Sequence, residues 1–220
     1  VMDGDMSQGS LALRLTGDLS PSIHTLQLYI DERIDQGFTG EMAWPQYYSP
    51  ENNPPLGPGE QTMRDFVHWH KSLPNLNLLA APEEPELFWD FGPDEYRHIL
   101  RMLSKFYDVI IIDTGTELVL ESQRAWLAHA NEVFIITAPE NDRLYNASKA
   151  VNYMIHDRPH PQDHSENPRK LAPLVSPDKL SVVMTRYDMD SGLDSYETIN
   201  EIFPWLNDSQ KFFIPDFSQE

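Results

Sequence analysis

The 220-residue chain contains no cysteine. Without thiols it has no disulfides, no zinc–thiolate site and no cysteine nucleophile, so those function classes are excluded. A chain without cysteine fits a reducing compartment, and we therefore expect a cytoplasmic protein.

Long apolar runs and basic residues are also scarce. The longest apolar runs have the length of a strand, well short of the roughly 18 residues that a membrane-spanning helix needs. The chain has 16 basic and 35 acidic residues, which give a formal net charge of −19. This charge opposes direct DNA binding, which needs clustered Lys and Arg to displace counterions. We therefore expect a protein partner.

No secretory signal peptide is visible, and the first residue is Val1. A first residue other than Met predicts a fragment or a processed product. The sequence leaves membrane association open.

Two kinds of apolar segment alternate along the chain. Short runs rich in β-branched or aromatic residues predict strands at 76–81, 109–113, 133–137, 180–185 and 212–214. Segments with helical spacing predict helices at 23–34, 94–106, 120–130, 143–155 and 196–205. Strands that alternate with helices predict an α/β fold with a mainly parallel twisted sheet and helices on both faces.

Two proline-rich segments interrupt this alternation, at residues 40–60 and 158–177. Neither has a helical or strand period, and neither is long enough to form a domain. We expect both to be surface loops on a single domain that spans residues 1–220. The aromatic residues of the first loop leave room for a partner surface.

Residues 109–112 form an unbroken Val-Ile-Ile-Ile run that leads into Asp113. A run without polar alternation predicts a parallel strand that is covered on both faces. Two interpretations of Asp113 stand. It caps the following helix, or it lies at the carboxyl end of the strand, where acids commonly meet Mg²⁺ and nucleotide phosphates.

The first residues carry two further acids, Asp3 and Asp5, followed by a glycine and an apolar run. The period of a strand points both carboxylates the same way, which is unfavourable unless a cation or water lies between them. The same Asp-Gly-Asp sequence is also common in turns.

The pair His68 and His70 suits a metal site only if its segment is a strand. The surrounding residues 65–71 favour a helix, so we expect two solvated histidines and no metal.

Five segments in order resemble landmarks of the MinD/ParA family of P-loop ATPases. They are Asp-Gly-Asp at 3–5 with Gly-Ser-Leu downstream, Tyr-Asp-Val-Ile-Ile-Ile-Asp-Thr-Gly at 107–115, Glu-Val-Phe-Ile-Ile-Thr-Ala-Pro-Glu at 132–140, Leu-Ser-Val-Val-Met-Thr-Arg-Tyr at 180–187 and Phe-Ile-Pro-Asp at 213–216. The Asp-Thr-Gly form is most similar to actinobacterial MinD-like ATPases, and the first segment also resembles the TadZ/CpaE-like branch. The resemblance implies a P-loop NTPase fold of the SIMIBI type.

The resemblance also implies residue roles and cofactors, namely ATP and Mg²⁺. Asp113 would be the Walker B acid that holds Mg²⁺ through a water. Asp5 would orient the attacking water, and Asp3 would be its partner near the metal. Gly115 would belong to the segment that senses the γ-phosphate. In addition, Arg186, Pro215 and Asp216 would lie near the adenine.

The chain departs from the family pattern at its defining element. In the family, the glycine-rich loop with its lysines precedes the Asp-Gly-Asp segment, and that region is not in this sequence, so an ATPase would carry the loop upstream of Val1. Within the sequence, Gly57 and Gly59 lack the Lys-Ser/Thr that such a loop needs. Glu117 adds an acid near the expected γ-phosphate, where repulsion would slow hydrolysis unless the side chain turns outward.

Two functions therefore stand at the level of sequence. The first is an ATP-hydrolysing switch that dimerises through a nucleotide sandwich and positions cargo such as a chromosome, a septum, or a pilus or secretion machine. The second is a non-hydrolysing scaffold of the same fold.

Overall fold

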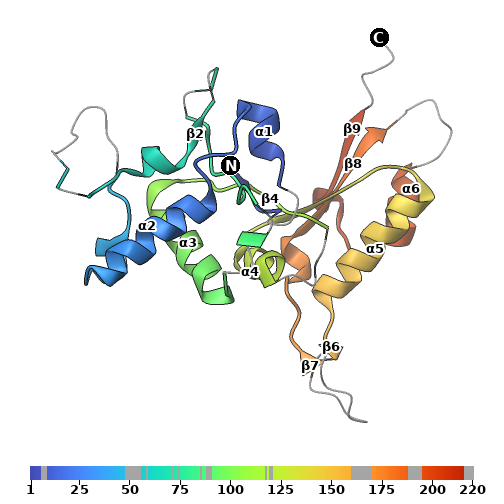
Figure 1. The fold of residues 1–220 in the computed structure, drawn as a ribbon. Coiled ribbons are helices and arrows are strands. Elements are labelled where there is room, and N and C mark those ends of the chain that lie inside the picture. The colour runs from blue at the N-terminus through green and yellow to red at the C-terminus, as the bar shows by residue number, and fades with distance from the viewer. Residues whose placement is uncertain are drawn as a thin grey trace. The chain divides into compact units, whose positions relative to one another are not determined.

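The computed structural model describes residues 1–5, 9–47, 56–57, 59–70, 72–73, 75–84, 86–87, 91–116, 118, 121–159, 170–187 and 195–215. The chain forms two compact units, Val1–Trp126 and Leu127–Glu220 (Figure 1). We describe each unit by itself.

The sheet of the first unit is built around β1 (Met2–Asp3). It pairs in parallel with β4 (Ile112–Asp113), so that Met2 faces Ile112 and Asp3 faces Asp113. On its other side, β1 meets Leu79 in a parallel bridge, and the Asp3 amide donates to the Leu79 carbonyl at 2.9 Å. Leu79 directly follows β3 (Asn77–Leu78), which pairs antiparallel with β2 (His68–Trp69).

Helices cover this sheet, and their ends follow from local sequence. The helices are α1 (Leu11–Thr16), α2 (Ile23–Asp35), α3 (Pro93–Phe106) and α4 (Glu121–His129), with 3-10 turns η1 (Gly40–Ala43) and η2 (Met63–Phe66). Ser22 and Thr25 form a capping box at the start of α2. Pro93 opens α3, where Glu95 accepts a hydrogen bond from the Gly92 amide at 2.9 Å.

The main core lies on one face of the sheet. Met2, Leu79 and the half-buried Ile112 pack there against α2, α3 and Trp126 of α4. The indole of Trp126 meets the Tyr96 ring edge-on at 4.9 Å between centroids. On the opposite face, Ala12 of α1 packs with the neighbouring positions Leu78 and Ala80.

The strand that ends at Asp113 is covered on one face only, so the prediction of two covered faces was wrong. Ile110 and Ile112 pack on the main core, whereas Val109 and Ile111 are 73% and 59% exposed. The physical reason is that α1 is short and packs beside Leu78 and Ala80, away from β4. Among the described residues of this unit, nothing covers Val109 and Ile111.

The expected helix at residues 65–71 is also wrong. Its start is the 3-10 turn η2, and His68 lies in strand β2. His68 is buried and its Nε2 lies 2.8 Å from the Pro21 carbonyl, so it is not a solvated histidine. Its burial and its contact with the Pro21 carbonyl show that His68 has a structural role in the first unit.

The second unit contains a parallel sheet in the order β5-β8-β9, formed by Val133–Thr137, Leu180–Tyr187 and Lys211–Pro215. Helix α5 (Asn141–Ile155) packs against β5 and against helix α6 (Ser195–Ile202). A short antiparallel pair, β6 (Arg158–Pro159) and β7 (Lys170–Leu171), lies within the second proline-rich segment, which also contains the start of the 3-10 turn η4 (Pro177–Lys179).

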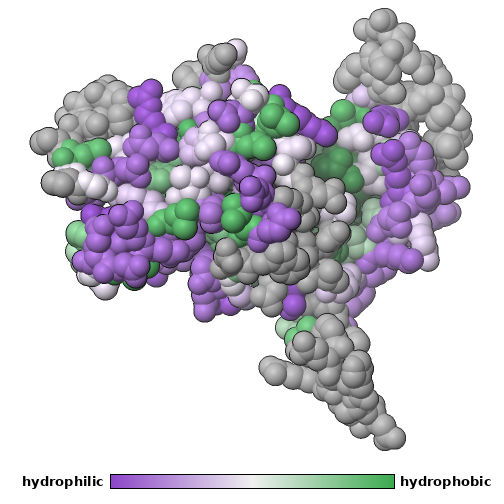
Figure 2. Space-filling model, viewed as in Figure 1, coloured by the Kyte–Doolittle hydropathy of each residue, from purple (hydrophilic) through white to green (hydrophobic). Residues whose placement is uncertain are grey.

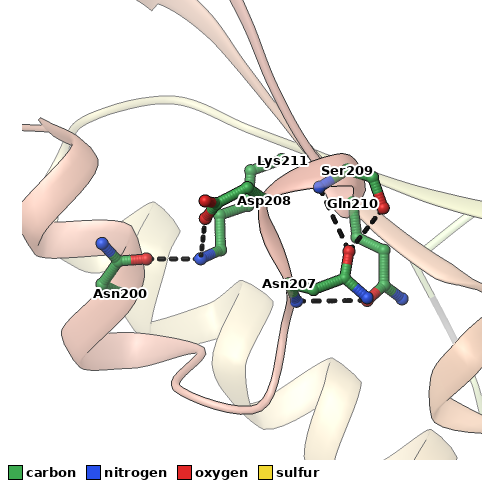
Figure 3. A network of polar contacts seen from close by, with 6 residues as sticks. All are labelled: Asn200, Asn207, Asp208, Ser209, Gln210 and Lys211. Atoms are coloured by element: carbon green, nitrogen blue, oxygen red, sulfur yellow. Dashed lines mark hydrogen bonds and ion pairs between the residues drawn. The ribbon is translucent and has the colours of Figure 1, made fainter.

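A polar network fixes the start of β9 (Figure 3). Lys211 bridges Asn200 of α6 and Asp208 of the 3-10 turn η5 (Asp208–Gln210). The buried Gln210 donates from Nε2 to the Leu180 carbonyl at 2.6 Å and to the Pro177 carbonyl at 2.9 Å. These bonds tie the entry of β9 to the entry of β8.

One face of the second sheet exposes large apolar side chains, which Figure 2 shows as green surface over these strands. The exposed residues are Phe134, Ile136, Phe212 and Ile214. Phe134 and Phe212 lie 6.2 Å apart, between ring centroids. Within the described part of this unit, the helices leave that face uncovered.

The predicted α/β class with parallel strands is confirmed. The expected strand at 133–137 matches β5, and the helix expected at 23–34 matches α2 to within one residue. The last predicted helix is shorter than expected, since α6 ends at Ile202 before Pro204. In the described residues, no helix is both long and apolar enough to cross a membrane.

Ile99 of α3 is fully buried in the main core. We expect Ile99→Ala to lower the free energy of unfolding by about 2–5 kcal/mol, because it leaves a cavity. Urea denaturation measures this change. Leu28→Ala on α2, where the side chain is 55% exposed, is the control and should change stability by about 0.5 kcal/mol or less. Equal losses in the two variants would contradict this packing.

Candidate functional site

The carboxyl ends of β1 and β4 lie side by side and bring three acids together. The three acids line a pocket of about 90 Å³. Its lining residues are Asp3, Asp5, Ser10, Leu11, Arg14, Asp113 and Thr114. Parallel pairing produces this convergence, because two parallel strands end at the same edge of a sheet. The pocket therefore joins the first residues of the chain to the segment around Asp113.

Asp3 is the buried member of the three and holds the start of α1. Its Oδ2 accepts a hydrogen bond from the Leu11 amide at 2.8 Å, and the Ala12 and Asp5 amides also contact it. Ser10, at the N-cap position, makes no side-chain cap of its own. Asp3 therefore supplies the anchor of a six-residue helix that would be too short to stand alone.

Burial raises the pKa of Asp3 above its ordinary value. The Leu11 amide opposes this shift by stabilising the ionised form, while the negative charge of Asp113 adds to it. The ionised form of Asp3 is thus less favourable in the folded chain than in the unfolded chain. Buried acids with a raised pKa are frequent at functional sites, although a helix anchor also explains this one.

Glycines allow the loops of the site to approach closely. A Cβ on Gly115 would lie 2.8 Å from Cγ of Asp5, so the Asp5 carboxylate rests directly on Gly115. A Cβ on Gly9 would lie 2.3 Å from the Ala81 Cβ and 3.1 Å from Cγ of Asp3. Side chains at either position would displace the acids.

Asp5 and Asp113 are the acids that solvent reaches in this pocket. Asp113 is exposed and Asp5 is half-buried, in contrast to Asp3. In the described part of the chain, no three His, Asp or Glu side chains are grouped so that they alone could hold a metal ion. One or two carboxylates fit Mg²⁺ when phosphate and water oxygens complete its shell, which is its usual mode at nucleotide sites.

Arg14 contributes a positive charge to this pocket from α1. The sequence did not assign Arg14, Ser10 or Thr114 to the site. The clue for Ser10 and Arg14 was the short apolar run after Gly9, which predicts a helix that turns back over the strand ends. Thr114 directly follows Asp113 in the chain and lines the same pocket.

The remaining predicted site residues belong to the second unit. Arg186 lies at the carboxyl end of β8, and Pro215 ends β9 opposite Tyr187. Arg186 has a φ of 54°, and the strand register shifts between Met184 and Tyr187. A left-handed arginine is strained backbone, which often marks a functional position. Asp216 and Glu117 lie outside the described residues.

Two solved structures share the fold of this chain. The ParA family ATPase from Chlorobium tepidum TLS matches with a TM-score of 0.59 and 19% identity, over 99% of this chain and 71% of that one. The cell division ATPase MinD of Pyrococcus furiosus matches with a TM-score of 0.50 and 16% identity, over 91% of this chain and 65% of that one.

At these identities the two matches establish the fold. The resemblance to MinD/ParA ATPases that the five segments predicted is therefore confirmed at the level of the fold. No protein-family model and no curated protein matches the chain.

The raised pKa of Asp3 has a consequence for stability that depends on pH. Below this pKa the folded chain holds a proton on Asp3, and the associated stability is lost as the pH rises through that pKa. We expect Asp3→Asn, which keeps an acceptor for the Leu11 amide, to gain stability relative to the parent as the pH rises from the ordinary range of an aspartate through the raised pKa. Thermal unfolding across this range measures the difference.

Asp178→Asn is the control with the opposite sign. The Ser176 hydroxyl lowers the pKa of the exposed Asp178, so this variant should lose stability relative to the parent as the pH rises. If the difference between Asp3→Asn and the parent does not change with pH, burial does not raise the pKa of Asp3.

Proposed function

We propose that this chain, which has the fold of the ParA and MinD ATPases, binds Mg²⁺ and ATP beside the carboxyl ends of β1 and β4. It hydrolyses the nucleotide and acts as a dimeric switch that positions a cellular cargo.

The observation that carries the proposal is the convergence of Asp5 and Asp113 in one pocket beside Gly115. In open α/β sheets, ligands bind at the carboxyl ends of parallel strands. Asp5 thus meets Asp113 and Gly115, which lie more than a hundred residues further along the chain, where a nucleotide phosphate would lie. An N-cap role for Asp113 alone would not require Asp5 to rest on Gly115.

The chain's own residues divide the work at this pocket. Mg²⁺ would neutralise charge on the transferred phosphate. Asp113, which is exposed at the tip of β4, would hold the metal through a water molecule. Asp5 accepts a hydrogen bond from the attacking water and orients it. Asp3 anchors α1 and would be the partner of Asp5 near the metal. Arg14 would add a positive charge beside the phosphates.

Gly115 couples these roles. Since the Asp5 carboxylate lies against its Cα, a shift of residues 114–116 toward a γ-phosphate moves the surface on which Asp5 rests. Nucleotide binding and the position of the attacking water are thereby linked.

In this proposal, recognition of the base keeps the assignment that the resemblance to MinD/ParA ATPases implies. Arg186 and Pro215 lie at the carboxyl ends of the adjacent strands β8 and β9, and Asp216 follows directly in sequence.

The net charge of −19 favours a protein cargo over direct DNA binding. Two chains would associate through a nucleotide sandwich.

A second candidate is a scaffold of the same fold that does not hydrolyse ATP. The exposed apolar side chains of β5 and β9, and of Val109 and Ile111, favour it because such surfaces bind proteins. The scaffold predicts no phosphate release, with or without Mg²⁺.

Calorimetry with ATP and Mg²⁺ tests the binding step. We expect the protein to bind Mg-ATP, and Asp113→Ala to weaken this binding about 10- to 100-fold, as the loss of an outer-shell partner of a metal does. Asp142→Ala, at an exposed site in the first turn of α5, is the control and should bind like the parent. Absence of binding by the full-length protein with its native N-terminus would refute the proposal.

Asp5→Ala separates binding from hydrolysis. We expect this variant to bind Mg-ATP like the parent while its turnover falls about 100-fold, because the attacking water loses its orienting acceptor. Phosphate release under saturating Mg-ATP measures the effect. Equal turnover in the variant and the parent would rule out this role for Asp5.

A further inference from the structure

Gln123 of α4 is a fully buried polar residue next to the acidic segment of the candidate site. Its Nε2 donates a hydrogen bond to the Gly4 carbonyl at 3.3 Å. Gly4 stands between Asp3 and Asp5, so this bond connects α4 directly to the acidic segment of β1.

The peptide groups of Gly4 are held from two sides. Its amide donates to the Asp113 carbonyl at 2.8 Å, and its carbonyl accepts from Gln123. Its Cα is confined as well, since a Cβ there would lie 2.5 Å from Ile112 Cγ2 and 3.3 Å from Trp126 Nε1. The direction in which the chain leaves Gly4 toward Asp5 therefore depends on β4 and α4 together.

A buried glutamine at position 123 stabilises the fold less than an apolar side chain would. Gln123 Oε1, Ser122 Oγ and Trp126 Nε1 are buried and have no hydrogen-bond partner among the described residues. Each unpartnered buried polar atom destabilises the fold, and an apolar side chain of similar size at position 123 would avoid this. A buried glutamine with one bond, aimed at the peptide next to Asp5, points to a role in the site.

We propose that Gln123 is a positioning residue that holds Asp5 in its working place through the Gly4 carbonyl and couples that place to the start of α4. The proposal rests on the proposed function, in which Asp5 orients the attacking water. Helix α4 follows the segment that contains Asp113 and Gly115. A movement of that segment on nucleotide binding is passed to Asp5 along two routes, the contact with Gly115 and the Gln123 bond.

This role predicts a separation of kinetic parameters. Asp113 reaches the pocket without Gln123, so the affinity for Mg-ATP should not depend on the Gln123 bond. The attacking water depends on Asp5, and a small displacement of a catalytic group lowers the rate steeply. Loss of the bond should therefore act on kcat and leave KM unchanged.

Gln123→Met is the test, because methionine has a similar length and no donor. We expect kcat to fall about tenfold or more, with KM within about twofold of the parent. Gln210→Met is the matched control. Gln210 is also a buried glutamine that donates to backbone carbonyls, but it lies in the second unit at the start of β9 (Figure 3). We expect it to lose stability without a change in kcat or KM.

A second measurement needs no nucleotide. Hydrogen exchange of the Gly4 and Asp5 amides should be faster in Gln123→Met than in the parent, and unchanged in Gln210→Met. Gln123→Asn, which keeps the donor but is one carbon shorter, should show the same faster exchange and serves if the methionine variant does not fold.

The outcomes distinguish the two proposals. If the parent protein does not hydrolyse ATP, the proposed function fails, while faster exchange at Gly4 and Asp5 would still support the link between α4 and Asp5. If the parent hydrolyses ATP and Gln123→Met keeps the parent's kcat, the positioning role is overturned. Unchanged exchange at both amides, or an equal fall of kcat in Gln210→Met, would overturn it as well.

Discussion

The parallel pairing of β1 with β4 is the interaction on which the candidate site depends. It sets Asp3 opposite Asp113 and delivers Asp5 to the same end of the sheet. A shift of the register by one residue would turn one of the acids into the core face that Met2 and Ile112 occupy. The buried pair Met2 and Leu79 resists such a shift, so packing on the core face determines the geometry on the polar face.

The same pairing places Asp3 where burial and a neighbouring negative charge disfavour its ionised form. Asp3 is buried, and the negative charge of Asp113 lies close to it. The amides of the first turn of α1 compensate in part, and in return Asp3 holds a helix too short to persist alone. Helix α1 brings Arg14 to the pocket, so the charge balance of the site and the order of this helix are linked.

The sequence predicted the elements with strong periodicity and failed where the tertiary environment decides. Helices α2 and α3 and strand β5 were found nearly to the residue, because their apolar spacing matches their structure. The His68 segment was assigned to a helix, although pairing with β3 makes it a strand. The run 109–112 indicated a strand covered on both faces, but Val109 and Ile111 are exposed. Apolar residues show that burial of a strand is favourable, and they do not show whether another element is present to cover it. Asp3, Asp5 and Asp113 were assigned to the candidate site from motifs, and the structure places them around one pocket. Arg14 and Gln123 reach the candidate site through packing that no local pattern encodes.

The bond from Gln123 to Gly4 joins residues that are 119 positions apart. Closing so long a segment carries an entropic penalty that the contacts of α2 and α3 must first offset, so the site belongs to the late events of folding. During synthesis, the segment that carries Asp3 and Asp5 is made before β4 and α4. Until then Asp3 and Asp5 lie on an unpaired segment without the Asp113 backbone that shapes them. The pocket for a phosphate thus forms only after β4 and α4 have been made.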